Sequence, residues 1–126
     1  MNDIEYRDYC LTLAQRFSER LAQEAGRASP DDPLRDLQAG FEALACGQDV
    51  YERGPALVAR LFGSCPQLAP LFPRELLWFI GGECLHFMPD SELAQFQQLE
   101  DMRADAAARG ERLDYQAERA KLLKLQ

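Results

Sequence analysis

The stretch DIEYRDYCLTLAQRFSERLAQEA, residues 3–25, is the segment that decides the fold class of this chain. Its apolar residues recur at spacings of 4, 3, 4 and 4, which is the period of one face of an α-helix. These residues are Tyr6, Cys10, Leu13, Phe17 and Leu21. Asp3 and Glu5 lie in the first turn, where the helix dipole favours negative charge, and Gly26 opens a polar segment. We therefore expect one amphipathic helix over residues 3–25.

Two further helices are expected in the next part of the chain. Asp32 is suited to cap the first of them, Pro33 to its first position, and Gly47 to a left-handed residue after its end. The second is expected from about residue 49 to residue 62. Gly54-Pro55 in its middle predicts a bend or a break, because proline removes a backbone donor. The apolar residues around this pair favour one bent helix.

Prolines and glycines punctuate the middle of the chain. Residues 63–73 contain three prolines and predict a loop with at most one turn of helix. The last of these, Pro73, suits the first position of a short helix that extends to Ile80. Gly81-Gly82 then ends this helix, since each glycine costs up to about 1 kcal/mol in a helix interior.

The remaining residues predict two more helices, over 90–109 and 113–125, with Asp90 as the cap of the former. The buried stripe of the former is expected to consist of Leu93, Phe96, Leu99 and Met102. No alternating strand pattern of convincing length occurs in the sequence. The sequence therefore predicts an all-α fold, a compact bundle of five or six helices in a single domain over residues 1–126.

Composition and charge exclude several classes of function. The chain of 126 residues has 14 basic and 21 acidic side chains, with a net charge of −7 spread over both halves. No basic face or tail is present, so we expect no binding to nucleic acid. No signal peptide or long apolar run is visible, which predicts a cytoplasmic protein that does not associate with membranes. Twelve of the fourteen basic residues are Arg, which points to a GC-rich bacterial genome.

The stretch LFPRELLWFIGGECLHFMPD, residues 71–90, holds the single Trp and the single His of the chain. Large apolar side chains surround its two adjacent glycines, and aromatic residues and Met are enriched at the centres of protein interfaces. Two interpretations stay open, the centre of the core and a surface that binds a protein partner or a second copy. The predicted contact residues are Trp78, Phe79, Phe87 and Met88.

The same stretch offers a weaker candidate for a metal or small-ligand site, formed by Glu83, Cys84 and His86. Glu-x-x-His spacing is used in di-iron bundles, but these need two such pairs, and this chain has one His. Two chains in a dimer, or Cys84 together with His86, would be needed to complete a site. The competing interpretation is a solvent-bordering Glu83 and a partly buried His86.

No motif for a cofactor or for catalysis accompanies these residues. The four cysteines contain no CxxC pair and are expected to be reduced, with Cys65, at the end of a helix, the more exposed thiol. One His leaves few general bases, so an enzyme is disfavoured. The sequence therefore predicts an accessory or regulatory protein that acts through protein–protein contacts as a homodimer, with metal or ligand binding as the alternative.

Overall fold

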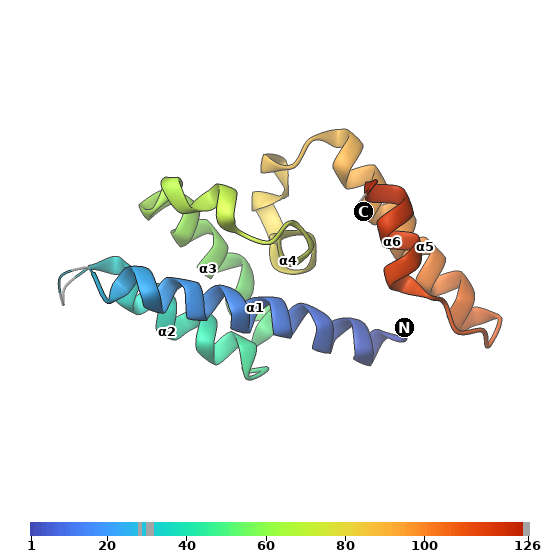
Figure 1. Ribbon diagram of the computed structural model, residues 1–126, viewed down its shortest axis with the longest axis horizontal. Helices are drawn as coiled ribbons and strands as arrows, with labels where there is room; N and C mark the ends of the chain where they lie inside the picture. The colour runs from blue at the N-terminus through green and yellow to red at the C-terminus, as the bar shows by residue number, and fades with distance from the viewer. Residues whose placement is uncertain (28, 30–31, 125–126) are drawn as a thin grey trace. The chain divides into compact units, whose positions relative to one another are not determined.

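The computed structural model describes residues 1–27, 29 and 32–124 (Figure 1). Every element in these residues is a helix and no strand occurs among them, so the predicted all-α fold is confirmed. The elements in chain order are α1 (Asp3–Ala25), α2 (Pro33–Ala45), α3 (Val50–Ser64), the 3₁₀-helix η1 (Pro66–Leu71), α4 (Arg74–Ile80), the 3₁₀-helix η2 (Gly82–Phe87), α5 (Asp90–Ala108) and α6 (Tyr115–Leu123). The predicted end of the last helix, at Leu125, lies outside the described residues.

The chain divides into two units, each with its own internal contacts. The larger unit comprises Tyr9–Leu85, and the smaller comprises Met1–Asp8 together with the chain from His86 onward. Helix α1 therefore gives its first residues to the smaller unit and the rest to the larger one. The single domain expected from the sequence stays a prediction. None of the helices in the described part of the chain is long and apolar enough to span a bilayer.

Aromatic rings form the centre of the larger unit. Phe72, between η1 and α4, contacts a ring from each of three helices, with centroid distances of 4.9 Å to Phe17 of α1, 5.8 Å to Phe41 of α2 and 5.8 Å to Phe62 of α3. Two of these pairs are edge-on, the geometry that the quadrupoles of the rings favour. All four side chains are buried. The segment before α4 is therefore anchored on three helices at once.

The ends of α2 follow the signals in the sequence. A side-chain oxygen of Asp32 accepts a hydrogen bond from the Leu34 N–H at 2.9 Å, and Pro33 occupies the first helical position. Gly47 has a φ of +87°, and its N–H donates to the Leu44 carbonyl at 2.9 Å. The next N–H, of Gln48, donates back to the Ala43 carbonyl, which completes a Schellman motif. Both predicted caps are thus confirmed.

Helix α3 continues through Gly54-Pro55 as one helix over Val50–Ser64, as favoured from the sequence. Gly54 allows a close approach to α4, because a Cβ on Gly54 would lie 2.9 Å from the Ile80 Cβ. Gly82 packs in the same way against Pro55, where an added Cβ would lie 2.9 Å from the Pro55 Cβ. The φ of Gly82, +55°, also favours glycine. These glycines therefore serve packing between α3, α4 and the start of η2.

Two segments differ from the sequence prediction. The proline-rich segment expected to be a loop with at most one turn contains the six-residue 3₁₀-helix η1, and Gly82–Phe87 forms a second, η2. A 3₁₀-helix tolerates Pro66 at its first position, where no N–H is needed.

The start of α5 also differs from the prediction. Asp90 is the first residue of α5, and the flanking residue Pro89 takes the cap position without a side-chain hydrogen bond. The predicted cap at Asp90 is therefore wrong by one position.

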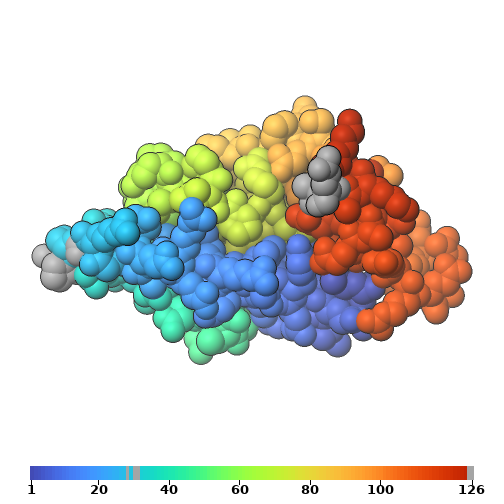
Figure 2. All heavy atoms as spheres, viewed as in Figure 1, coloured from blue at the N-terminus to red at the C-terminus, as the bar shows by residue number. Residues whose placement is uncertain are grey.

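In the smaller unit, α5 and α6 pack against each other, and their atoms meet along the orange and red surface in Figure 2. Gln95, near the start of α5, donates through Nε2 to the Leu122 carbonyl near the end of α6 at 3.1 Å, so the two helices run antiparallel. Gly110, with a φ of +67°, begins the turn between them. The Glu111 N–H donates to the Ala106 carbonyl at 2.8 Å, which completes a second Schellman motif.

Candidate functional site

The predicted contact residues of the larger unit lie at the end of α4. Trp78 and Phe79 are both partly exposed. The Phe79 ring meets the Tyr51 ring of α3 edge-on, with 5.7 Å between the ring centroids. Tyr51 is 64% exposed and was not among the residues singled out from the sequence. Its exposure could have been predicted from the sequence, because Tyr51 lies off the apolar stripe of α3 and its ring must therefore face the surface.

The predicted contact residues of the smaller unit differ sharply in exposure. Phe87 is 52% exposed, and its ring lies 4.3 Å from the His86 ring by centroid distance. Met88, the next residue, is only 3% exposed and belongs to the interior of the folded chain. Of these two, Phe87 is the side chain that a partner would reach.

The three candidate metal ligands are not gathered into a metal site. Among the described residues, no group of three or more His, Cys, Asp or Glu side chains is placed to hold a metal ion. Glu83 and His86 are exposed, whereas Cys84 is buried, so the expectation of a partly buried His86 is wrong. Burial, and secondly the charge of Glu83, raise the pKa of the Cys84 thiol. A raised pKa disfavours the thiolate that binds metals and acts as a nucleophile.

The exposed thiol of the chain is Cys46, which follows the end of α2. The expectation that Cys65 is the more exposed thiol is wrong, because Cys65 is buried. Burial, and secondly the charge of Asp32, raise the pKa of the Cys65 thiol. A cysteine at a helix end is exposed only if the following segment leaves it uncovered, and here η1 begins at the next residue.

Sequence reasoning missed Arg103, a charged residue in the interior of the smaller unit. Arg103 is 8% exposed, and its guanidinium carbon lies 3.7 Å from the centroid of the Tyr6 ring and 5.8 Å from that of Tyr115. The two rings themselves meet edge-on at 5.5 Å. The predicted stripe of α5 placed Leu93 and Met102 inside, but both are partly exposed. Arg103, four residues after Leu99, takes the buried position expected for Met102.

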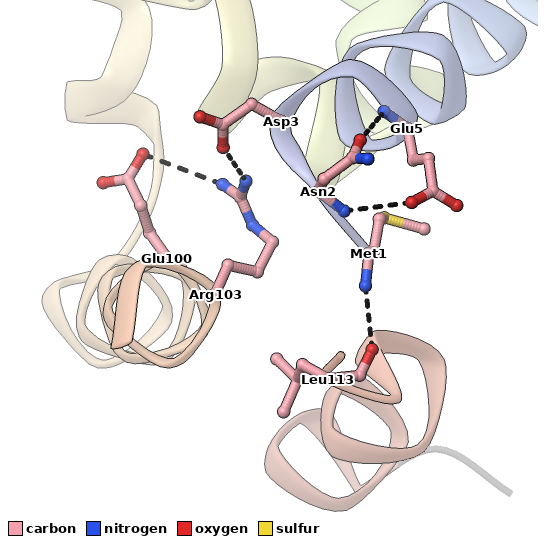
Figure 3. A network of polar contacts seen from close by, with 7 residues as sticks. All are labelled: Met1, Asn2, Asp3, Glu5, Glu100, Arg103 and Leu113. Atoms are coloured by element: carbon pink, nitrogen blue, oxygen red, sulfur yellow. Dashed lines mark hydrogen bonds and ion pairs between the residues drawn. The ribbon is translucent and has the colours of Figure 1, made fainter. Parts of the chain in front are cut away.

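Polar contacts of Arg103 connect parts of the chain that are far apart in sequence (Figure 3). Its Nη1 donates to the Asp3 carboxylate at 3.2 Å, and its Nη2 lies 4.0 Å from the Glu100 carboxylate. Its Nε is buried and has no hydrogen-bond partner among the described residues. Asp3 is fully exposed and Glu100 is half-exposed, so water screens both of the charges that face this buried cation.

The start of α1 is held by a capping box next to this arginine. The Asn2 side chain accepts from the Glu5 N–H at 2.8 Å, and the Glu5 carboxylate accepts from the Asn2 N–H at 3.2 Å. Arg112 pairs with the same carboxylate at 2.6 Å, and the Met1 amino nitrogen donates to the Leu113 carbonyl at 2.8 Å. Beside these residues lies a cavity of about 220 Å³, which Arg103 also lines.

Comparison with known proteins gives one family. The model of the PA2817-like family matches residues 3–126. The chain belongs to this family. Neither a curated protein nor a solved structure matches the chain. The match to the PA2817-like family covers residues of both units, including the exposed aromatic residues and Arg103. The description of the family names no activity.

Proposed function

We propose that this PA2817-like protein acts through protein–protein contacts, as an accessory or regulatory module that forms a homodimer in the bacterial cytoplasm. The observation that carries the proposal is the aromatic pair of Tyr51 and Phe79 on the larger unit, with Trp78 next to it in sequence. Tyr51 is 64% exposed and Phe79 and Trp78 are partly exposed, so their apolar area is in contact with water.

Exposed aromatic residues favour a contact function for a physical reason. Aromatic side chains bury a large area with few rotatable bonds, so they dominate the binding energy at the centres of interfaces. Tyr51 and Phe79 come from two helices that pack closely through Gly54 and Ile80. A pair on rigid helices loses little conformational entropy when a partner covers it. Phe87 gives the smaller unit an exposed ring of its own.

The first test of this function is the mass of the untagged protein, purified without chelator, in a native mass spectrum. A dimer is the expected result, and a chain that stays monomeric as its concentration is raised would exclude the homodimer. The same spectrum tests the alternative function. Extra mass that matches a metal or metabolite, and that is lost in His86→Ala, would establish a ligand site at Glu83, Cys84 and His86 instead.

The second test places the contact on the aromatic pair. Tyr51→Asp adds a carboxylate to this surface, whereas Ala59→Asp adds one to another exposed position of the same helix. Loss of an aromatic anchor is expected to weaken the dimer at least about tenfold, as measured by sedimentation, and the Ala59 variant is expected to leave it unchanged. Equal dimer affinity in both variants, with helical content preserved, would exclude this surface.

A further inference from the structure

A groove lies between α2 and α3 of the larger unit, which pack against each other (Figure 1). Its volume is about 310 Å³, and its apolar lining consists of Gly40 of α2 with Ala56 and Leu57 of α3. Gly40 allows the close packing of the two helices, because a Cβ there would lie 2.6 Å from Leu57 Cδ2. A lining of such small residues lets a further helix approach closely.

Charged side chains of both signs line each end of this groove. Residues 46–49 join α2 to α3, and the two helices pack along each other, so they run in roughly opposite directions. Asp36 and Arg60 therefore lie at the end away from this turn, and Glu52 and Arg53 lie at the end next to it. The groove is thus bordered by an acidic and a basic residue at either end.

Glu52 and Arg60 are exposed, and neither has an ion-pair partner in the part of the chain that the structure describes. Arg53 instead pairs with Asp49, four residues earlier on the same helix, at 3.5 Å. Glu52 and Arg60 are eight residues apart, about 12 Å along α3, with Ala56 midway between them. A segment that fits this face therefore carries a cation and an anion separated by about two helical turns.

Helix α3 itself carries this pattern. We infer that the groove is a contact between two copies of the chain, in which α3 packs antiparallel on the same helix of a second copy about a two-fold axis at Ala56. Residues equally far from Ala56 on opposite sides then meet, so Glu52 faces Arg60 of the partner subunit. The symmetry forms this ion pair twice and makes the surface complementary to itself. Antiparallel packing also places opposite ends of the two helix dipoles side by side.

This contact is separate from the aromatic pair of the proposed function. Tyr51 is five residues before Ala56, which places the two side chains about 140° apart around α3. A copy packed in the groove therefore leaves Tyr51 uncovered, and two different two-fold contacts on one chain join two dimers into a tetramer. The tetramer rests on the proposed homodimer, whereas the groove contact does not. Ion pairs open to water contribute little, so the groove contact is the weaker one and forms at higher concentration.

Sedimentation velocity of the full chain, at rising concentration and low salt, measures this association. The wild type is expected to pass from dimer to tetramer, and salt is expected to weaken this step by screening the ion pairs. Arg60→Glu is expected to weaken it at least about tenfold, since two repulsive contacts replace two attractive ones. Arg20→Glu makes the same charge change at an exposed position of α1 outside the groove. The absence of any association step that Arg60→Glu weakens more than Arg20→Glu would overturn the groove contact.

Two further sets of variants test the symmetry of the contact, with circular dichroism to check that each stays helical. Glu52→Arg combined with Arg60→Glu restores opposite charges across the axis and is expected to recover the wild-type association. Ala56→Glu and Ala56→Lys are both expected to weaken it, because a residue on a two-fold axis meets its own copy. Ala39→Glu, at an exposed position that does not line the groove, is the control. A folded double variant that fails to recover would overturn the antiparallel pairing.

Tyr51→Asp distinguishes this contact from the aromatic one. If both contacts exist, this variant still dimerises through the groove as its concentration is raised, and adding Arg60→Glu makes it monomeric. If only the groove contact exists, Tyr51→Asp associates like the wild type, and Arg60→Glu alone gives a monomer. A Tyr51→Asp chain that stays monomeric at every concentration would overturn the groove contact and leave the aromatic contact standing.

Discussion

The two units of this chain have interiors of different character. The larger unit is centred on Phe72, whose ring meets three others from three helices. The interior of the smaller unit includes a charged side chain, Arg103, stacked on Tyr6. Ring contacts depend on shape and excluded water, whereas the contacts of Arg103 also depend on charge, salt and exposure. The comparison predicts that packing changes affect the larger unit most and charge changes affect the smaller unit most.

The contacts of Arg103 also reach further along the chain. Its hydrogen bond to Asp3 spans 100 residues, and that from Arg112 to Glu5 spans 107. These contacts fasten the start of α1 to α5 and to the turn after it, within the smaller unit. These electrostatic contacts therefore close loops of about a hundred residues, and closing a long loop costs more conformational entropy than closing a short one.

The largest expected effect is that of removing the central ring of the larger unit. Phe72→Ala is expected to lower the free energy of unfolding by about 3–5 kcal/mol, because the cavity left behind is lined by three rings that cannot collapse fully. Urea unfolding followed by circular dichroism measures it. Phe87→Ala, at an exposed position, is the control and is expected to cost under about 1 kcal/mol. Similar losses in the two variants would contradict the assigned core.

The next effect separates packing from charge at Arg103. Arg103→Ala is expected to cost about 2 kcal/mol, since the stem and the stacking on Tyr6 are both lost. Arg103→Met restores the stem and a sulfur–aromatic contact, and is expected to cost under about 1 kcal/mol. This variant leaves the Asp3 carboxylate without its arginine, but Asp3 is fully exposed, so water solvates its charge. Equal losses in urea unfolding for the two variants would assign the stability to the charge instead.

The helices of this chain could be predicted because their signals are local. The stripe from Tyr6 to Leu21 and the cap at Asp32 each lie within a few residues of the structure they specify. The 3₁₀-helices were missed because Pro66 and Gly82 favour irregular structure by local rules. At the start of η2, Gly82 packs against Pro55, and this contact joins residues more than twenty positions apart in the sequence.

The role of Arg103 was not predictable from local pattern for the same reason. Its only local signal is its position four residues after Leu99 in an otherwise apolar stripe, where Met102 was the more ordinary choice. The reason for its burial is Tyr6, nearly a hundred residues earlier. The burial of Cys65 likewise depends on which segments cover it. Tertiary contacts therefore explain the missed residues, and local periodicity explains the correct helices.

The third prediction compares the helix caps of the two units. Asp32→Ala and Asn2→Ala are each expected to cost about 1 kcal/mol, because each leaves a backbone N–H at a helix start without its acceptor. Melting temperatures of both variants measure the losses. Asp32→Asn is the control, since asparagine caps about as well as aspartate, and is expected to be nearly neutral. A loss in Asp32→Asn equal to that in Asp32→Ala would show that charge, and not the cap, is responsible.

The smallest effect is the acid sensitivity of the capping box. The hydrogen bond from the Asn2 backbone, and the charge of Arg112, hold the pKa of Glu5 below its ordinary value of 4.5. The ionised carboxylate therefore stabilises the folded chain above that value, and this contribution is lost as the pH falls through the lowered pKa. Glu5→Gln keeps a capping side chain without the charge, so its melting temperature is expected to fall less steeply in acid than that of the wild type. Glu52→Gln, at an exposed position of the larger unit, is expected to follow the wild-type curve. If the Glu5→Gln and wild-type curves stay parallel in acid, the Glu5 charge does not stabilise the start of α1.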